Sequence, residues 1–332
     1  MCRKISVAMC TYNGAKFIKE QLQSILDQEL CVNEIVVCDD GSNDGTIDIV
    51  KQVVLMHPEI CWIIQQNISN LGVTKNFEKA ISLCTGDYIF LSDQDDIWHR
   101  DKTKVIIDFF DENPGCDVVF TDANLVGKDG ALISKYTLLD SFLLKPYFYL
   151  WEKGFKFEIL NIWNVATGAT MALRRSFVDN LFIKDDKYYL HDYQIVIDAC
   201  KTNSIGVILE CLMDYRQHGD NVVGISKKWW IYKENPVPPS LLKMIVEPHA
   251  VRESFEGVDD RVSFYETRYK NYSSVKGKVL LFFSVLTYIK FYKDIWTIFY
   301  YSDLLYGVNR KLREWYVNWK DYKINKSRTV LL

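Results

Sequence analysis

The segment 86–98, GDYIFLSDQDDIW, decides the fold, because it joins a short apolar run directly to a cluster of carboxylates. Residues 88–91 have no polar residue in alternation, which predicts a strand that is buried on both faces, as in a parallel sheet. Asp93, Asp95 and Asp96 follow where that strand ends. Mg²⁺ and Mn²⁺ prefer carboxylate oxygens, so the cluster is a candidate cation site. A solvated acidic turn is the simpler alternative.

Outward from this segment, buried strands alternate with helices. Apolar runs at 5–10, 34–38 and 60–65 predict three more strands, and apolar residues at helical spacing predict the helices between them. This alternation predicts an α/β protein with a doubly wound, mostly parallel sheet flanked by helices. Ligands of such sheets bind beyond the carboxyl ends of the strands. The later part adds helices after residue 102 and within 188–200, and strands at 118–121, 167–173 and 207–209.

Two more polar clusters follow predicted strands, at the same sheet edge as the acidic cluster. Thr11, Tyr12 and Asn13 follow the first strand, and Asp39 and Asp40 follow the second. An aspartate at such a position can accept a hydrogen bond from a base N–H or a ribose hydroxyl. An Asx turn that caps the next helix explains the aspartates equally well. The meeting of the three clusters predicts one ligand site at this edge.

Residues later in the chain add a candidate base and candidate phosphate ligands. Asp192, after His191, opens a predicted helix, where the helix dipole favours a carboxylate and where general-base catalysis on a hydroxyl acceptor is the functional interpretation. Arg216 and His218 follow a strand, and they could bind phosphate and metal, although a single His is more often structural. Lys75 could contact phosphate, with a surface lysine as the simpler alternative. Walker, GxGxxG, HExxH and GxSxG motifs are absent from the sequence.

The order of these motifs resembles the family-2 glycosyltransferases of the GT-A fold, over about residues 4–225. The matching segments are VAMCTYNGAKFIKEQLQSIL, EIVVCDDGSNDGT, NLGVTKNFEKA, GDYIFLSDQDDIW, ATGATMALRR, HDYQIVIDA and YRQHGDNVVG. The segments SDQDDIW, HDY and YRQHGDN look like the bacterial enzymes that build O-antigens and capsules, many of them rhamnosyltransferases. The resemblance implies inverting transfer of a sugar from a nucleotide diphosphate, dTDP-rhamnose or a UDP-hexose, to a hydroxyl of a lipid-linked, growing cell-surface polysaccharide.

The resemblance, added to the interpretation of the residues, predicts a role for each candidate. Asp192 would be the catalytic base. A Mn²⁺ or Mg²⁺ ion would be held by Asp93, Asp95 and His218. His191, Thr167 and Gly168 would lie on the acceptor side, with His191 at a position where many family members carry an acidic residue. The nucleotide would be bound by Thr11, Tyr12, Asn13, Asp39, Asp40, Lys75, Asp93 and Arg216.

Charge and composition divide the chain into two parts. We expect a catalytic domain at 1–227, with nucleotide-sugar binding at about 1–125 and the acceptor side at about 126–227, and a helical, basic and aromatic region at 228–332. Residues 268–328 contain 13 Lys/Arg against 4 Asp/Glu, although the whole chain has a net charge of −3. Basic amphipathic helices at membrane interfaces have this composition, so we expect peripheral membrane contact. A helical subdomain packed on the catalytic domain, or on a second subunit of a homodimer, is the alternative.

The remaining composition bears on location and on partners. The net charge gives no case for nucleic-acid binding. The nine scattered cysteines predict reduced thiols. The start of the chain does not fit a signal peptide, and the apolar run at 279–289 is shorter than the roughly 20 residues that a membrane-spanning helix needs. We therefore expect a cytoplasmic protein at the inner face of the bacterial plasma membrane.

Two other functions are consistent with an α/β nucleotide fold. A sugar-nucleotide nucleotidyltransferase also uses a parallel sheet and a metal, but it normally carries a Gly-rich phosphate loop, and TYNGAK is not one. A non-catalytic nucleotide-sugar-binding protein is disfavoured, because Asp39, Asp95 and Asp192 are intact.

Overall fold

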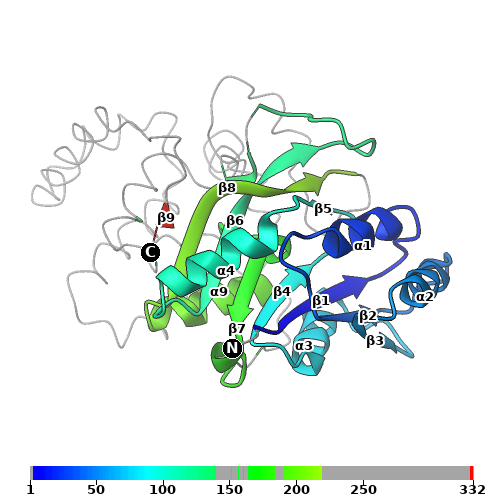
Figure 1. Ribbon diagram of the computed structural model, residues 1–332, viewed down its shortest axis with the longest axis horizontal. Helices are drawn as coiled ribbons and strands as arrows, with labels where there is room; N and C mark the ends of the chain where they lie inside the picture. The colour runs from blue at the N-terminus through cyan, green and yellow to red at the C-terminus, as the bar shows by residue number, and fades with distance from the viewer. Residues whose placement is uncertain are drawn as a thin grey trace, which may run out of the picture. The chain divides into compact units, whose positions relative to one another are not determined.

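A computed structural model describes residues 3–135, 137–139, 151, 156, 160, 164–181, 183, 190–218 and the backbone of 330–331. Its centre is a nine-stranded sheet with the order β3-β2-β1-β4-β7-β6-β8-β5, and β9 pairs with β8 (Figure 1). The strands are β1 Ile5–Thr11, β2 Glu34–Asp39, β3 Cys61–Gln66, β4 Tyr88–Ser92, β5 Ile97–Trp98, β6 Val118–Val126, β7 Met171–Arg174, β8 Ile205–Arg216 and β9 Val330–Leu331.

The first half of the sheet is parallel, as the apolar runs predict. β1 pairs in parallel with β2 and with β4, and β2 pairs in parallel with β3. Every residue of β1, β2 and β4 is buried, because helices cover both faces of these strands. β7 runs antiparallel to β4 and β6, while β6 and β8 are parallel. The predicted α/β class with a mostly parallel, doubly wound sheet is therefore confirmed.

The helices join the strands and cover the sheet with apolar faces. In α1, Ile18, Leu22 and Ile25 are fully buried, at the i, i+4, i+7 spacing of one helix face. The Asp44 carboxylate accepts the Thr46 N–H at 3.1 Å, which satisfies a donor at the start of α2. The described helices are α1 Ile18–Leu26, α2 Thr46–Met56, α3 Val73–Leu83, α4 Lys102–Glu112, the 3₁₀ helix η1 Gly168–Thr170, α8 Arg175–Val178 and α9 His191–Lys201.

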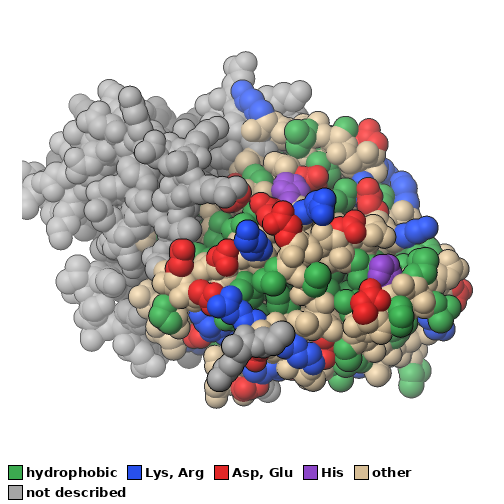
Figure 2. Space-filling view, in the orientation of Figure 1, with side chains coloured by type: hydrophobic (Ala, Val, Ile, Leu, Met, Phe, Trp, Pro, Cys, Tyr) green, Lys and Arg blue, Asp and Glu red, His purple; other side chains and the backbone are tan. Residues whose placement is uncertain are grey.

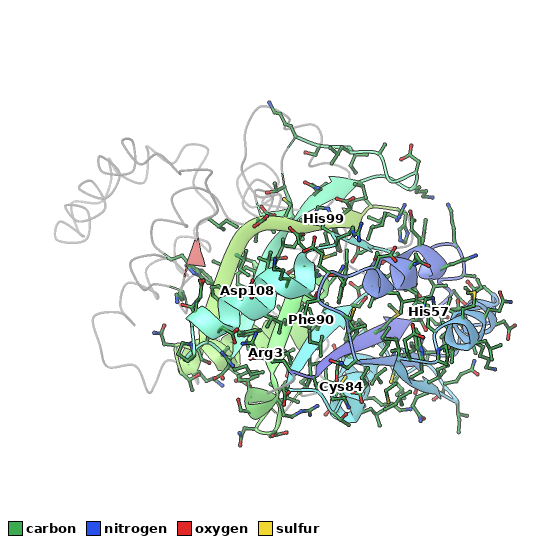
Figure 3. All side chains as sticks on the ribbon, in the orientation of Figure 1. Arg3, His57, Cys84, Phe90, His99 and Asp108 are labelled. Atoms are coloured by element: carbon green, nitrogen blue, oxygen red, sulfur yellow. The ribbon has the colours of Figure 1, made fainter. Side chains whose placement is uncertain are left out.

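The segment that follows β4 is anchored to the long strand β8. Phe90 of β4 is buried in the core (Figure 3), and its ring centroid is 5.8 Å from that of Trp98 in β5. His99 follows β5, and its ring nitrogens lie 2.9 Å from the Cys211 carbonyl and 2.8 Å from Asp214 Oδ1. The acidic loop at 93–96 therefore starts and ends on fixed strands.

Two parts of the structure differ from the sequence-based expectation. β8 has 12 residues, although the sequence predicts a strand only at 207–209. The polar residues Glu210 and Asp214 interrupt the apolar pattern, so the sequence does not reveal the full length of this strand. The pairing of β6 with β8 also shifts register between Thr121 and Asn124. Residues 330–331 form a strand on β8, where we expect helix. The rest of the expected C-terminal region, 228–329 and 332, lies outside the described residues.

The chain divides into two compact units, and the sheet belongs to the unit made of Met1–Asp140, Asn164–Gly224 and Lys326–Leu332. The other unit comprises Ser141–Trp163 and Ile225–Asn325. In the part of the chain that the structure describes, the helices are too short or too polar to cross a membrane.

Candidate active site

The loops after β1 and β4 are joined by one side-chain amide. Gln94 Oε1 accepts the Tyr12 N–H at 2.8 Å, and Gln94 Nε2 donates to the Tyr12 carbonyl at 3.0 Å. Gly14 allows this contact, since a Cβ at that position would lie 2.1 Å from Gln94 Oε1. Asn13 has φ +50, and its N–H donates to Ser42 Oγ at 2.8 Å. The first polar cluster is therefore tied to the other two.

Asp39 is fully buried at the end of β2. Its carboxylate accepts hydrogen bonds from Thr11 Oγ1 at 2.7 Å, from the Ser42 N–H at 2.9 Å and from Gln66 Nε2 at 3.3 Å. These donors fix Asp39 and Thr11 against each other. Tyr12, by contrast, is half exposed, so its ring is available to a ligand at this edge.

Asp40 shapes the loop that follows β3. Its Oδ1 accepts from Asn67 Nδ2 at 2.9 Å and from the Leu71 N–H at 2.7 Å, and its Oδ2 accepts the Gly72 N–H at 2.9 Å. These contacts hold the chain just before α3. Lys75 lies on the first turn of α3 and is exposed.

The acidic loop carries carboxylates that affect each other's pKa. Asp93 is half-buried, and burial, followed by the negative charges of Asp95 and Asp192, raises its pKa to about 7. His218 Nε2 lies 2.6 Å from Asp95 Oδ2, and the imidazole stacks on Phe17 with the ring centroids 5.1 Å apart. The structure thus brings the three predicted metal ligands to the same loop.

Arg216 holds the acidic loop in place through hydrogen bonds. Its N–H donates to Asp96 Oδ1 at 3.0 Å, and its Nε donates to the Asp95 carbonyl at 2.7 Å. The guanidinium also contacts Glu20 Oε2 at 2.6 Å and the Lys128 carbonyl at 3.0 Å, and only 2 % of the residue is exposed. These contacts direct Arg216 toward protein acceptors, and its binding of phosphate stays a prediction.

Asp192 is the first-turn carboxylate of α9. Its Oδ1 accepts the Tyr193 N–H at 2.6 Å, and its Oδ2 accepts the Gly168 N–H at 3.3 Å. Burial raises the Asp192 pKa to about 6, against the lowering effect of these hydrogen bonds. A carboxyl group whose pKa lies near neutral pH suits general-base catalysis. Thr167 lies next to Gly168, and its carbonyl accepts from Thr170 at the turn of η1.

His191 packs into the core beside the site. Only 4 % of it is exposed, and its ring stacks on Phe77 with centroids 4.0 Å apart. Within the described residues, neither ring nitrogen has a hydrogen-bond partner, and burial lowers the His191 pKa to about 3. A Cβ on Gly168 would lie 2.8 Å from His191 Nε2, so the two residues are in close contact. This burial favours a packing role for His191, and its acceptor contact stays a prediction.

The donor set can be compared with the needs of a divalent cation. Among the described residues, no three His, Cys, Asp or Glu side chains are gathered closely enough to hold a metal unaided. Mg²⁺ usually takes one or two protein carboxylates and completes its shell with substrate phosphates and water. Asp93 and Asp95 lie in each other's field, and His218 touches Asp95, so these residues fit a site that a diphosphate would complete.

The family model described as Glycosyl transferase family 2 matches residues 6–182 of this chain. The chain belongs to that family. The matched residues contain the loops after β1, β2 and β4 and the turn of η1. Membership favours a glycosyltransferase over the nucleotidyltransferase and the non-catalytic binding protein that the sequence leaves open.

This glycosyltransferase is similar to named relatives over most of their length. It is 33% identical to the "dTDP-rhamnosyl transferase RfbG" of Shigella flexneri, over 66% of this chain and 74% of the relative. It is 26% identical to the "Putative teichuronic acid biosynthesis glycosyltransferase TuaG" of Bacillus subtilis, over 69% of this chain and 87% of the relative. The crystal structure of S. aureus TarS 1-349 in complex with UDP-GlcNAc has a TM-score of 0.50 at 20% identity, over 67% of this chain and 62% of TarS 1-349, which shows the shared fold.

Two residues that lie against the candidate site are absent from the sequence-based candidates. Glu20 of α1 pairs with Arg216, and Lys102 lies fully buried at the start of α4 beside the acidic loop. Helical spacing places Glu20 on a polar face of α1. Its partner Arg216 is distant in the sequence, so a single sequence does not predict their contact. Lys102 precedes the apolar face of its helix, and a lysine there is normally taken as a surface residue.

Proposed function

We propose that this glycosyltransferase transfers a sugar from a nucleoside diphosphate donor to a hydroxyl group of a cell-surface polysaccharide, with inversion and with Mn²⁺ or Mg²⁺ bound. The observation that carries the proposal is geometric: hydrogen bonds join the loops after β1, β2 and β4, His218 contacts Asp95, and Asp192 lies near enough to Asp93 to raise its pKa. A cluster for a cation and a candidate base therefore share one edge of the sheet, beside the loops after β1 and β2.

Each residue has a role in that reaction. Asp192 accepts the proton of the acceptor hydroxyl as the hydroxyl oxygen attacks the anomeric carbon and the bond to the diphosphate breaks. Asp93, Asp95 and His218 would hold the divalent ion, which when bound neutralises charge on the leaving diphosphate. Arg216 keeps the acidic loop in place through its contacts to Asp95 and Asp96. Tyr12 and the loop at 67–72 flank the position of the nucleoside.

The relatives favour particular substrates. The name of the Shigella flexneri relative favours dTDP-rhamnose as the donor, with UDP-hexoses as the alternative. The name of the Bacillus subtilis relative, from teichuronic acid biosynthesis, supports a surface polysaccharide as the acceptor. A lipid-linked acceptor would place the enzyme at the inner face of the plasma membrane.

A thermal-shift screen tests the donor and the metal together. dTDP, UDP, GDP, dTDP-rhamnose and UDP-glucose are each added with Mn²⁺ or with EDTA. A ligand at 100 times its Kd stabilises the native state by about 2.7 kcal/mol, so the preferred donor should raise the Tm by several degrees in Mn²⁺ and less in EDTA. Asp95→Asn should remove the part of the shift that depends on Mn²⁺. A Tm that no sugar nucleotide raises in Mn²⁺ contradicts the proposal.

A turnover assay separates an enzyme from a binding protein. Wild-type protein should hydrolyse the preferred sugar nucleotide in Mn²⁺, with water as the acceptor. Asp192→Asn should keep the Tm shift and lose about 10²–10⁴-fold in kcat, because the base is removed while the donor site is intact. Equal turnover by wild type and Asp192→Asn assigns the base elsewhere.

A further inference from the structure

Lys102, the first residue of α4, has no exposed surface. Its Nζ donates to the Ala169 carbonyl at 2.9 Å and lies 3.2 Å from Met213 Sδ. The same nitrogen lies 4.3 Å from the centroid of the Trp98 ring, a favourable position for a cation. Four segments of the catalytic unit, α4, η1, β5 and β8, therefore meet at one ammonium group.

A buried lysine is costly and needs compensation. Removal of an ammonium from water costs several kcal/mol unless opposite charges and hydrogen bonds offset it. Burial lowers the Lys102 pKa to about 7, while the negative charges of Asp96 and Asp93 act in the opposite direction. Asp96 is itself buried, and its Oδ2 has no hydrogen-bond donor within the described residues. Burial and the charges of Asp95 and Asp93 raise the Asp96 pKa well above its usual range, and Lys102 acts in the opposite direction, so each group favours the charged form of the other.

The contact with Ala169 reaches the candidate base. Ala169 lies in the centre of η1, between Gly168 and Thr170. The Gly168 N–H donates to Asp192 Oδ2, and the Thr170 N–H donates to the Thr167 carbonyl at 2.9 Å. The ammonium therefore holds the turn 167–170 from one side, and the turn holds the carboxylate of Asp192 from the other.

We propose that Lys102 is a positioning residue that fixes the turn 167–170, and through it the carboxylate of Asp192, relative to the acidic loop. This proposal rests on the proposed function, since it takes Asp192 as the base. Lys102 touches neither donor nor acceptor in this assignment. Its Nζ reaches the base side through the Ala169 carbonyl, and it also lies over the ring of Trp98, which follows the acidic loop.

Four variants test the proposal: Lys102→Met, Lys104→Met, Asp96→Asn and the double variant Lys102→Met/Asp96→Asn. Lys104 lies two residues further along α4 and is exposed, so Lys104→Met is the matched control. Lys102→Met removes the cation that favours the charged form of the buried Asp96, so any charge left on Asp96 lowers stability. The double variant removes both charges, and its amide oxygen can still accept the Arg216 N–H.

The first measurement needs no ligand. Hydrogen–deuterium exchange of the Gly168 and Thr170 amides should be faster in Lys102→Met and in the double variant than in wild type and Lys104→Met, because the turn has lost its anchor. The Tm of the double variant should recover toward that of wild type. Unchanged exchange in the turn overturns the proposal.

The second measurement is turnover of dTDP-rhamnose in Mn²⁺ with water as acceptor. The kcat of the double variant should be about 10- to 100-fold below that of wild type, with a change in KM below about threefold, because a misplaced base slows the chemical step and spares donor binding. Recovery of kcat together with the Tm means that Lys102 only neutralises Asp96, which overturns the proposal. Failure of the proposed function shows separately, as absence of turnover by wild type with every donor, while the exchange result is unaffected.

Discussion

Asp192, the proposed base, has a pKa that burial raises toward neutral pH. A base must be unprotonated to accept the acceptor proton, and burial raises the Asp192 pKa to about 6. The kcat, measured with saturating donor and Mn²⁺, should therefore rise with pH through about 6 and become constant above about pH 7. A profile from pH 4.5 to 8.5 checks this limb. A kcat that stays constant between pH 5 and 8 contradicts the assignment of Asp192.

His191 should make the stability of the fold dependent on pH. Its pKa is lowered from 6.5 to about 3, so between these values the unfolded chain binds a proton that the folded chain does not. The free energy of unfolding must then increase with pH across this window and be lost as pH falls below about 6.5. One such group changes the free energy of unfolding by about 2 kcal/mol between pH 6.5 and pH 5.

His191→Phe isolates that contribution, because a phenyl ring keeps the stacking on Phe77 and cannot be protonated. Urea unfolding at pH 7 and pH 5 should show a loss of stability in wild type that is about 2 kcal/mol larger than in the variant. His57→Phe, at a half-buried position directly after α2 where the imidazole contacts Glu59, is the control for a generic histidine replacement. Equal losses in wild type and His191→Phe mean that His191 is protonated in the fold.

Among the elements, the contact between the β1 loop and the β4 loop is the most sensitive to a small change. Gly14→Ala would place a Cβ 2.1 Å from Gln94 Oε1, and the flexible amide would have to leave the Tyr12 backbone. We expect stability within about 1 kcal/mol of wild type, since a side chain moves and no strand does. Donor KM should rise by about tenfold, because two loops of the proposed nucleotide site are no longer joined.

Gln94→Ala removes the same contact without overlap, so it should reproduce the KM of Gly14→Ala. The double variant Gly14→Ala/Gln94→Ala should be no worse than either single variant, because both act on one interaction. Additive losses would show that Gly14 acts elsewhere, for instance through its N–H donation to Thr46 Oγ1 at 2.8 Å.

Individual elements also show how far the sequence predicts this structure. β1, β2 and β4 can be predicted because burial on both faces demands uninterrupted apolar residues, and the polar residues after them must then share one edge. The full length of β8 cannot be predicted in this way, because its later part alternates polar and apolar residues and its pairing with β6 shifts register. The contact of Arg216 with Glu20 spans 196 residues, and the burial of Lys102 depends on η1 and β8, so neither follows from local pattern.

At the scale of the whole molecule, the stretch at 268–328 has an excess of basic residues that the rest of the chain does not have. Acidic and basic side chains are interspersed on the visible face of the described part in Figure 2, and no extended surface of one sign is seen there. The excess of Lys and Arg at 268–328 lies outside the described residues. We propose that attraction to an anionic membrane depends on that stretch.

Vesicle co-sedimentation of the full chain tests this assignment. Four basic residues near an anionic surface contribute on the order of 4 kcal/mol, or roughly three orders of magnitude in partitioning. The protein should sediment with vesicles of phosphatidylglycerol and phosphatidylcholine, less with phosphatidylcholine alone, and less in high salt.

The test variant replaces by Gln the residues Lys276, Lys278, Lys290 and Lys293. The matched control replaces by Gln the exposed residues Lys19, Lys51, Lys104 and Lys201. The test variant should lose binding to the anionic vesicles while the control keeps it, because both lose the same net charge and differ only in its place. Equal loss in both variants would mean that net charge, and not the basic stretch, drives the association.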